Sequence, residues 1–178
     1  DDTIEAALSW PLRQKLAQLI FTGFNAGSGG SGTDPAQAKA LIDAGVGGLF
    51  VGRKEVGLFG SPVMLDAANN ALPPLVATDG EGGQVDVAPA IAPTLPAARE
   101  MADWGPDKIL SAGASRGTDL LSRGVNVDFA PVLDIAGGQN PLGDRTWSDD
   151  PQQVVTTAGA FAAGLCRSGV YPTFKHFP

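Results

Sequence analysis

The chain has 178 residues, 43% of them hydrophobic, and a formal net charge of −7 at pH 7. No run of roughly 18 apolar residues is present, so the sequence predicts no membrane span. With 12 basic residues and no basic cluster, the chain lacks the usual signature of a nucleic-acid-binding protein. Its single cysteine, Cys166, excludes a disulfide framework and a cysteine metal site, and we expect it to be buried as a small apolar residue.

Apolar segments recur along the chain, and we predict each of them to be a strand. They cover residues 19–24, 46–51, 75–78, 125–132 and 171–174. Near-continuous apolar character indicates parallel strands whose two faces are both covered. A helix from about Pro11, with Leu12, Leu16 and Leu19 on one face, precedes the first strand.

Helix starts and ends are marked by a repeated pattern between these strands. A capping side chain followed by proline predicts a helix start at Asp34-Pro35, Ser61-Pro62 and Asp150-Pro151. Glycines predict the helix ends, at Gly45, Gly124 and Gly169. In the last helix a stripe of core residues follows a 3.6-residue period: Val154, Val155, Ala158, Phe161, Ala162 and Leu165.

The alternation of strands and helices predicts parallel pairing with right-handed crossovers. Two α/β architectures fit this pattern, a TIM-type (β/α)8 barrel and an open doubly wound sheet. The second would use the glycine-rich stretch 26–32 as a phosphate-binding loop, but this stretch lacks a Gly-Lys-Ser/Thr ending and a tight G-x-G-x-x-G helix entry. We therefore interpret the stretch as a surface loop and favour the barrel.

Charged residues follow the predicted strands. Asp79 and Glu81 come after the third strand, Arg145 lies in the long loop after the fourth, and Lys175 and His176 end the fifth. Because the carboxyl ends of barrel strands carry the chemistry, we expect Asp79 to bind a ligand. Donors and acceptors of this kind suit a ligand with many hydroxyl groups.

Other polar or aromatic residues near these positions have structural interpretations. Glu81 lies between glycines, where it can hold the loop through backbone N–H groups, and Asp134 can organise the loop after the fourth strand. Arg145 can also pair with acids of its own loop. The tryptophans are interpreted as packing residues, with Trp147 of interest because it lies close to Arg145 in the sequence.

Several segments together resemble glycoside hydrolase family three, in particular its β-N-acetylglucosaminidase branch. They keep the family's order and approximate spacing and cover nearly the whole chain. The matching stretches are Ala77–Gly83, Thr94–Met101, Gly124–Asp134, Gly143–Trp147 with Asp149–Pro151, and Lys175–Pro178.

The resemblance implies that residues 1–178 form the N-terminal portion of a single TIM-type barrel domain, with about five of its eight strand–helix units. It implies hydrolysis of terminal β-linked N-acetylglucosamine in cell-wall or chitin-type saccharides, with retention of configuration. By matching position, Asp79, Arg145, Lys175 and His176 would bind the hydroxyls of the terminal sugar. The mechanism needs no metal or organic cofactor.

Two departures from the family pattern are visible. Gln84 and Val87 stand where arginines are usual. The acid/base loop and the nucleophilic aspartate of the family are expected beyond Pro178, so the chain alone is expected to be inactive and to contain no catalytic residue.

Alternative interpretations are a β-glucosidase of the same family and a non-catalytic saccharide-binding module, with nucleotide binding as a more distant one. We expect an extracellular or cell-envelope protein because the substrate that the resemblance implies is a wall polymer, with a cytoplasmic location as the alternative. The predicted partner is a saccharide substrate, no nucleic-acid partner is predicted, and the sequence leaves the oligomeric state open.

Overall fold

The computed structural model describes residues 2–24, 35–87 and 94–176. The chain divides into two compact units, Asp1–Val76 and Ala77–Pro178. Some positions on which predictions were based lie outside the described residues: the glycine-rich stretch 26–32, Asp34 and the last two residues. None of the described helices combines the length and apolar character that a membrane crossing needs.

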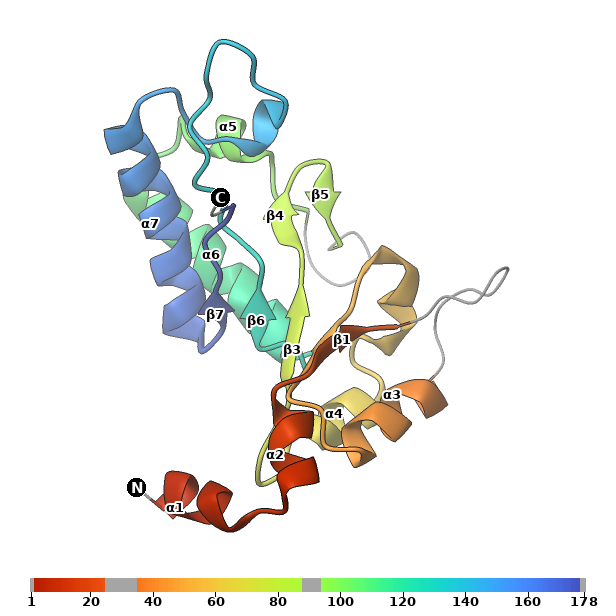
Figure 1. Ribbon diagram of the computed structural model, residues 1–178. Coiled ribbons are helices and arrows are strands. Elements are labelled where there is room, and N and C mark those ends of the chain that lie inside the picture. Colours follow the sequence, from red (N-terminus) through yellow and green to blue (C-terminus); the bar gives the residue numbers. More distant parts are fainter. Residues whose placement is uncertain (1, 25–34, 88–93, 177–178) are drawn as a thin grey trace. The chain divides into compact units, whose positions relative to one another are not determined.

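The first unit alternates short strands with helices (Figure 1). Its elements are α1 (Asp2–Ser9), α2 (Leu12–Gln18), β1 (Phe21–Gly23), α3 (Pro35–Asp43), β2 (Gly48–Phe50), the 3-10 helix η1 (Arg53–Leu58), α4 (Pro62–Ala68) and the beginning of β3 (Leu75–Thr78). Strand β1 pairs parallel with β2, and β2 is followed in the sheet by β3. The chain around Gly48 is tightly enclosed, because a Cβ atom there would lie 2.2 Å from the Phe21 ring.

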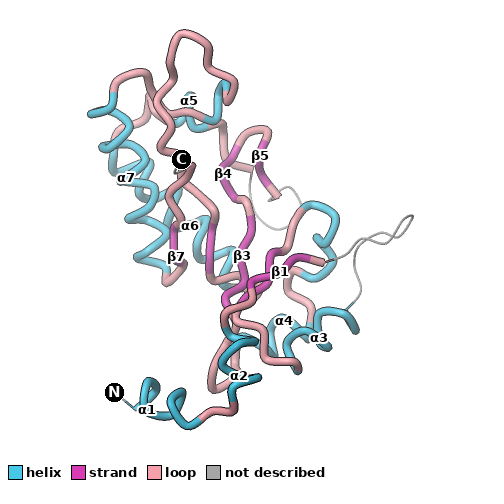
Figure 2. Tube along the Cα trace, viewed as in Figure 1, coloured by secondary structure: helices cyan, strands magenta, loops and turns pink. Residues whose placement is uncertain are grey.

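The second unit contains the rest of β3 and the longer helices (Figure 2). Its further elements are β4 (Gly80–Gly82), β5 (Val85–Asp86), α5 (Ala98–Met101), α6 (Pro106–Leu121), β6 (Val127–Asp128), the 3-10 helix η3 (Gly143–Arg145), α7 (Pro151–Ser168) and β7 (Tyr171–Pro172). Strands β3, β6 and β7 are parallel neighbours. Strands β4 and β5 form a small antiparallel hairpin that the sequence did not predict.

Helices α6 and α7 pack against each other through glycines. A Cβ atom on Gly113 would lie 2.3 Å from the Phe161 carbonyl oxygen, and one on Gly164 would lie 2.2 Å from the Leu110 carbonyl oxygen. The two backbones therefore approach more closely than any larger residue would allow. Fully or almost fully buried side chains of this unit form its core: Met101, Ile109, Leu120, Val125, Phe161 and Leu165.

The predicted helix boundaries are largely confirmed. Helix α7 begins after Asp150, whose side chain accepts a hydrogen bond from the Gln152 N–H, and ends at Gly169 in the left-handed conformation (φ 92°). Gly45 and Gly124 also have positive φ values, after the ends of α3 and α6. Helix α4 does begin at Pro62, but the Ser61 side chain makes no capping hydrogen bond.

Two predictions of burial are wrong. Val155 in α7 is 65% exposed, because the helix face that packs on α6 is narrower than the predicted stripe. Cys166 is also exposed, near the end of the same helix. The predicted helix face is only partly formed, because α2 contains Leu12 and Leu16 but ends before Leu19. The side chains of these three leucines are more than half exposed.

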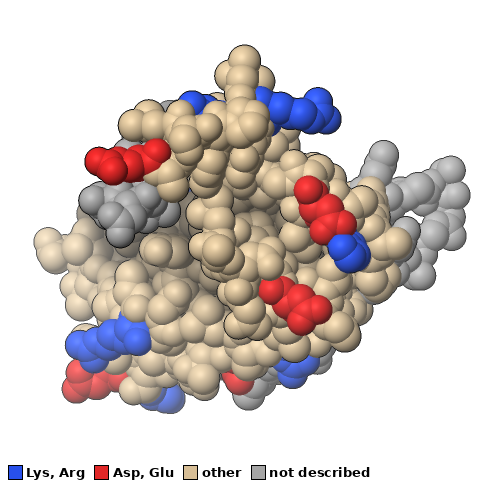
Figure 3. Space-filling model, turned by 90° about the horizontal axis from the view of Figure 1, so that it is seen from below, with Lys and Arg blue, Asp and Glu red and all other residues tan. Residues whose placement is uncertain are grey.

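The described residues thus form an α/β structure with mainly parallel strands. They include no closed barrel. Charged side chains of both signs are scattered over one face of the molecule, some next to a side chain of opposite sign and others surrounded by uncharged surface (Figure 3).

Candidate functional site

The candidate site lies in the second unit, where parallel strands deliver charged residues at their carboxyl ends. Asp79 follows β3, the segment leading to Asp134 follows β6, and Lys175 and His176 follow β7. Backbone pairing holds the last of these segments in place, since Val132 and Lys175 form a parallel bridge and the Leu133 N–H donates to the Lys175 carbonyl at 2.6 Å.

Lys175 is the centre of the cluster. Its ammonium donates to Asp79 Oδ1 at 2.8 Å and lies 2.5 Å from Glu81 Oε1. The Lys175 side chain is only 15% exposed, whereas the Asp79 side chain is 34% exposed. Asp79 therefore presents carboxylate surface to solvent, and Lys175 is fixed behind it.

Arg145 contacts the same glutamate, in part through the oxygen that Lys175 also contacts, Glu81 Oε1. Its guanidinium donates from Nε to Glu81 Oε2 and from Nη2 to Glu81 Oε1, both at 2.7 Å. This two-bond geometry fixes the plane of the guanidinium. The Glu81 side chain is 4% exposed, so it is a buried acceptor that joins the two cations.

The charge of Glu81 is stabilised by these partners. Burial alone would raise the pKa of the Glu81 carboxyl, but the hydrogen bonds from Arg145 and Lys175 outweigh it, so the pKa lies below its ordinary value. The hydrogen bonds to Glu81 raise the pKa of Arg145. Glu81 and Arg145 are therefore charged at neutral pH.

His176 pairs with Asp134 beside this cluster. Its Nδ1 lies 2.8 Å from Asp134 Oδ2, which also accepts the His176 backbone N–H at 3.0 Å. Burial would raise the pKa of the Asp134 carboxyl, but the hydrogen bonds from His176 outweigh this effect. The pKa therefore lies below its ordinary value. Because Nδ1 is engaged in this way and the imidazole is 46% exposed, its Nε2 edge is the part left for a ligand.

Two further contacts support the loops that carry the site. Arg116 in α6 forms a two-bond ion pair with Asp86 in β5, at 2.8 and 2.9 Å, and both side chains are almost completely buried. At the tip of the same hairpin, the Gln84 side-chain amide donates to Asp144 Oδ1 at 3.1 Å. Gln84 therefore links the hairpin to the loop that holds Arg145. Val87, the other position at which the family usually has arginine, is buried.

The structure brings together Asp79, Arg145 and Lys175 through Glu81, and it pairs His176 with Asp134. Sequence reasoning underestimated Glu81, which binds two side chains rather than the backbone of its own loop. It also overlooked Asp128, although an aspartate within the apolar stretch 125–132 was a visible signal. Trp147 is a packing residue, 2% exposed and 6.0 Å from the Phe161 ring between centroids.

Comparison with known proteins adds to this geometry. Residues 11–178 match the sequence profile described as the glycosyl hydrolase family 3 N terminal domain. The chain belongs to glycosyl hydrolase family 3. It is 36% identical over 173 residues to the beta-hexosaminidase LpqI of Mycobacterium tuberculosis, in an alignment that covers 93% of this chain and 42% of that protein.

Solved structures of family members have the same fold. A family 3 glycosyl hydrolase from Mycobacterium smegmatis superposes with a TM-score of 0.84 at 37% identity, covering 97% of this chain and 52% of that one. A beta-N-acetylhexosaminidase from Beutenbergia cavernae superposes with a TM-score of 0.74 at 28% identity, covering 96% and 54%. The chain thus spans about half the length of these family 3 relatives.

Proposed function

We propose that the chain is the part of a retaining β-N-acetylglucosaminidase that holds the terminal sugar. The observation that carries this proposal is the cluster of ion pairs in which Lys175 and Arg145 converge on Glu81 next to Asp79. Similarity to proteins named beta-hexosaminidase supports the choice of an N-acetylhexosamine as substrate. Cell-wall or chitin-type saccharides are the proposed source of that sugar.

The proposed sugar contacts follow from the exposure of each group. Asp79 and the Nε2 edge of His176 are accessible, and the Lys175 ammonium has a third N–H beyond the two that face carboxylates. Hydroxyl groups donate to carboxylates and accept from ammonium and guanidinium groups. Hydroxyl contacts of this kind raise the rate if they tighten as the sugar ring flattens toward the oxocarbenium-like transition state.

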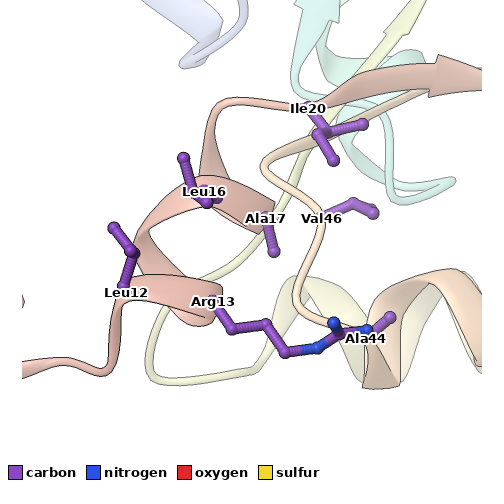
Figure 4. Close-up of a pocket in the computed structure, with 7 residues that line it drawn as sticks. All are labelled: Leu12, Arg13, Leu16, Ala17, Ile20, Ala44 and Val46. Atoms are coloured by element: carbon purple, nitrogen blue, oxygen red, sulfur yellow. The ribbon is translucent and has the colours of Figure 1, made fainter.

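We also propose that the two units are part of a TIM-type barrel in a longer polypeptide. That polypeptide would supply the remaining strands of the barrel and the acid/base and nucleophilic groups. An exposed apolar groove in the first unit supports this (Figure 4). The groove has a volume of about 430 Å³ and is lined by Leu12, Arg13, Leu16, Ala17, Ile20, Ala44 and Val46. Apolar surface of this kind is typically covered by another part of a protein. A location at the cell envelope or outside the cell is part of the same proposal and can be tested by fractionation.

The test of function uses the complete polypeptide and two chromogenic substrates. We expect hydrolysis of 4-nitrophenyl N-acetyl-β-glucosaminide to exceed that of the β-glucoside, and NMR to detect the β-anomer as the first product. Preference for the glucoside would assign the β-glucosidase alternative, and binding of N-acetylglucosamine without hydrolysis would assign a saccharide-binding module.

The test of the site uses Asp79→Ala and Lys175→Ala in the same polypeptide. Each is expected to lower kcat/KM more than tenfold, which corresponds to a loss above ~1.4 kcal/mol of transition-state stabilisation. Lys39→Ala is the matched control, because Lys39 is an exposed lysine paired with Asp43 on one helix of the first unit. Unchanged kinetics in both site variants would remove these residues from the site.

A further inference from the structure

Asp128 is a buried carboxyl that lies directly behind the candidate site. It belongs to β6 and is completely buried. Its Oδ1 accepts the Gly80 backbone N–H at 2.8 Å. Gly80 is the residue between Asp79 and Glu81, so this bond holds the backbone of both site carboxylates.

The approach of Asp128 to Gly80 is close enough to require glycine. A Cβ atom at position 80 would lie 2.7 Å from Asp128 Oδ2 and 2.9 Å from Oδ1. Asp128 Oδ2 is buried and finds no hydrogen-bond partner among the residues that the structure describes. The carboxyl group therefore has a single directional contact, and that contact is to the strand of the site.

The backbone around Asp128 holds the other half of the site. Its carbonyl oxygen accepts the Thr173 N–H at 2.8 Å, two residues before Lys175. The Phe129 N–H donates to the Thr78 carbonyl at 2.8 Å, immediately before Asp79. One short segment thus fixes both the strand that carries the acids and the strand that carries the lysine.

We propose that Asp128 is a positioning residue, which sets the separation between the Asp79 and Glu81 carboxylates and the Lys175 ammonium by anchoring the Gly80 amide. Asp128 is buried beneath the site and does not contact the sugar. Its effect on catalysis rests on the proposed function, but its effect on the geometry of the ion pairs does not.

The protonation of Asp128 suggests the conservative replacement for it. Burial raises the pKa of the Asp128 carboxyl to about 7, and the nearby charge of Asp86 adds to this effect. The hydrogen bond from the Gly80 N–H and the charges of Arg116 and Lys175 lower the pKa but do not outweigh burial. A neutral carboxyl group has nearly the shape and the acceptor of an asparagine amide. Asp128→Asn therefore retains the anchor, whereas Asp128→Leu keeps the branched shape and removes the acceptor.

The first experiment measures the position of Lys175 without any substrate. Both variants and the wild-type polypeptide are acetylated with an amine-reactive ester, and modification of Lys175 is followed by mass spectrometry. We expect Asp128→Asn to react at the wild-type rate and Asp128→Leu to react at least about fivefold faster, because a lysine that is no longer held against its carboxylate partners is more accessible to the ester. The rate at Lys39, in the other unit, should be equal in all three proteins.

The second experiment measures hydrolysis of the N-acetylglucosaminide by the same three proteins. Asp128→Leu is expected to lose more than about tenfold in kcat/KM and Asp128→Asn less than about threefold. A folded leucine variant with wild-type lysine reactivity would overturn the proposal, and so would an asparagine variant that behaves like the leucine variant. If the wild type hydrolyses no N-acetylglucosaminide, the proposed function fails, and the acetylation rates alone decide the role of Asp128.

A second variant applies if Asp128→Leu does not fold. Gly80→Ala keeps the acceptor but adds a methyl group 2.7 Å from Asp128 Oδ2, so the strand or the carboxyl group must move. We expect faster acetylation of Lys175 in this variant as well. A folded Gly80→Ala protein with wild-type reactivity at Lys175 contradicts the proposal.

Discussion

Glu81 shows how much a single residue in the site depends on partners that are distant in the sequence. The glycines on both sides of it suggested a local role in a loop. In the structure it accepts from Arg145, 64 residues away, and lies next to Lys175. The local sequence pattern indicates that a carboxylate lies in a turn after a strand. It contains no information on which distant cations contact that carboxylate.

The lowered pKa of Glu81 predicts a specific dependence of stability on pH. A carboxyl group whose folded pKa lies below its unfolded value stabilises the protein above the unfolded pKa, and this contribution is lost as the pH falls through the folded pKa. We expect Glu81→Gln to lower the free energy of unfolding by about 3 kcal/mol at pH 7, because two cations lose their buried counter-charge. The deficit should shrink in the acid range, below the ordinary pKa of a glutamate.

Urea denaturation at pH 7 and in the acid range measures this difference. Glu100→Gln is the matched control, because Glu100 carries the same chemical change on an exposed residue and should alter stability by less than about 0.5 kcal/mol. An equal deficit of Glu81→Gln at both pH values would show that packing, rather than charge, accounts for the loss.

At the scale of elements, the helices and strands were the most predictable part of the fold. Asp150 and Gly169 set the ends of α7 through local geometry, and such geometry is visible in the sequence. The hairpin of β4 and β5 was not predictable, because it is stabilised by the buried contact of Asp86 with Arg116 in a helix 30 residues away. The exposure of Val155 was missed for a related reason, since the width of a helix face depends on the shape of its partner.

The packing of α6 on α7 predicts opposite effects for two glycines of one helix. Gly164→Ala places a methyl group 2.2 Å from the Leu110 carbonyl oxygen, and we expect it to cost about 2 kcal/mol of stability because the helices must separate. Gly159→Ala meets no atom within 4 Å and should stabilise the protein by about 0.5–1 kcal/mol through helix propensity. Thermal denaturation of the two variants gives the comparison, and a destabilised Gly159→Ala protein would be inconsistent with this account.

At the scale of the whole molecule, the apolar groove of the first unit is the feature that the sequence predicted only in part. The spacing of leucines indicated an apolar face, but not that the face would remain exposed in this chain, with Leu12 at 70% and Leu16 at 53%. Whether such a face is covered depends on segments that pack on it. For the same reason, a parallel α/β fold could be derived from the strand pattern, while barrel closure stays a proposal.

Hydrogen exchange provides a test of that proposal. If the longer polypeptide covers the groove, amides in residues 12–23 should exchange at least about tenfold more slowly there than in the 178-residue chain, equivalent to about 1.4 kcal/mol of added protection. Amides around Gly113 in α6, which lie at an interface already formed, serve as the internal reference. Equal exchange of residues 12–23 in both proteins would mean that the groove remains open.

The ion pair between Lys175 and Asp79 spans 96 residues of sequence, and this separation has a consequence during synthesis on the ribosome. At a translation rate of about 5–20 residues per second, the two acids of the β3 turn emerge roughly 5–20 s before the lysine that neutralises them. Arg145 emerges 64 residues after Glu81 and can pair with it first, so Asp79 is the carboxylate that waits longest for its partner. Completion of the cluster therefore requires the segment that ends in Lys175, and a product terminated before this segment would present Asp79 without its lysine partner.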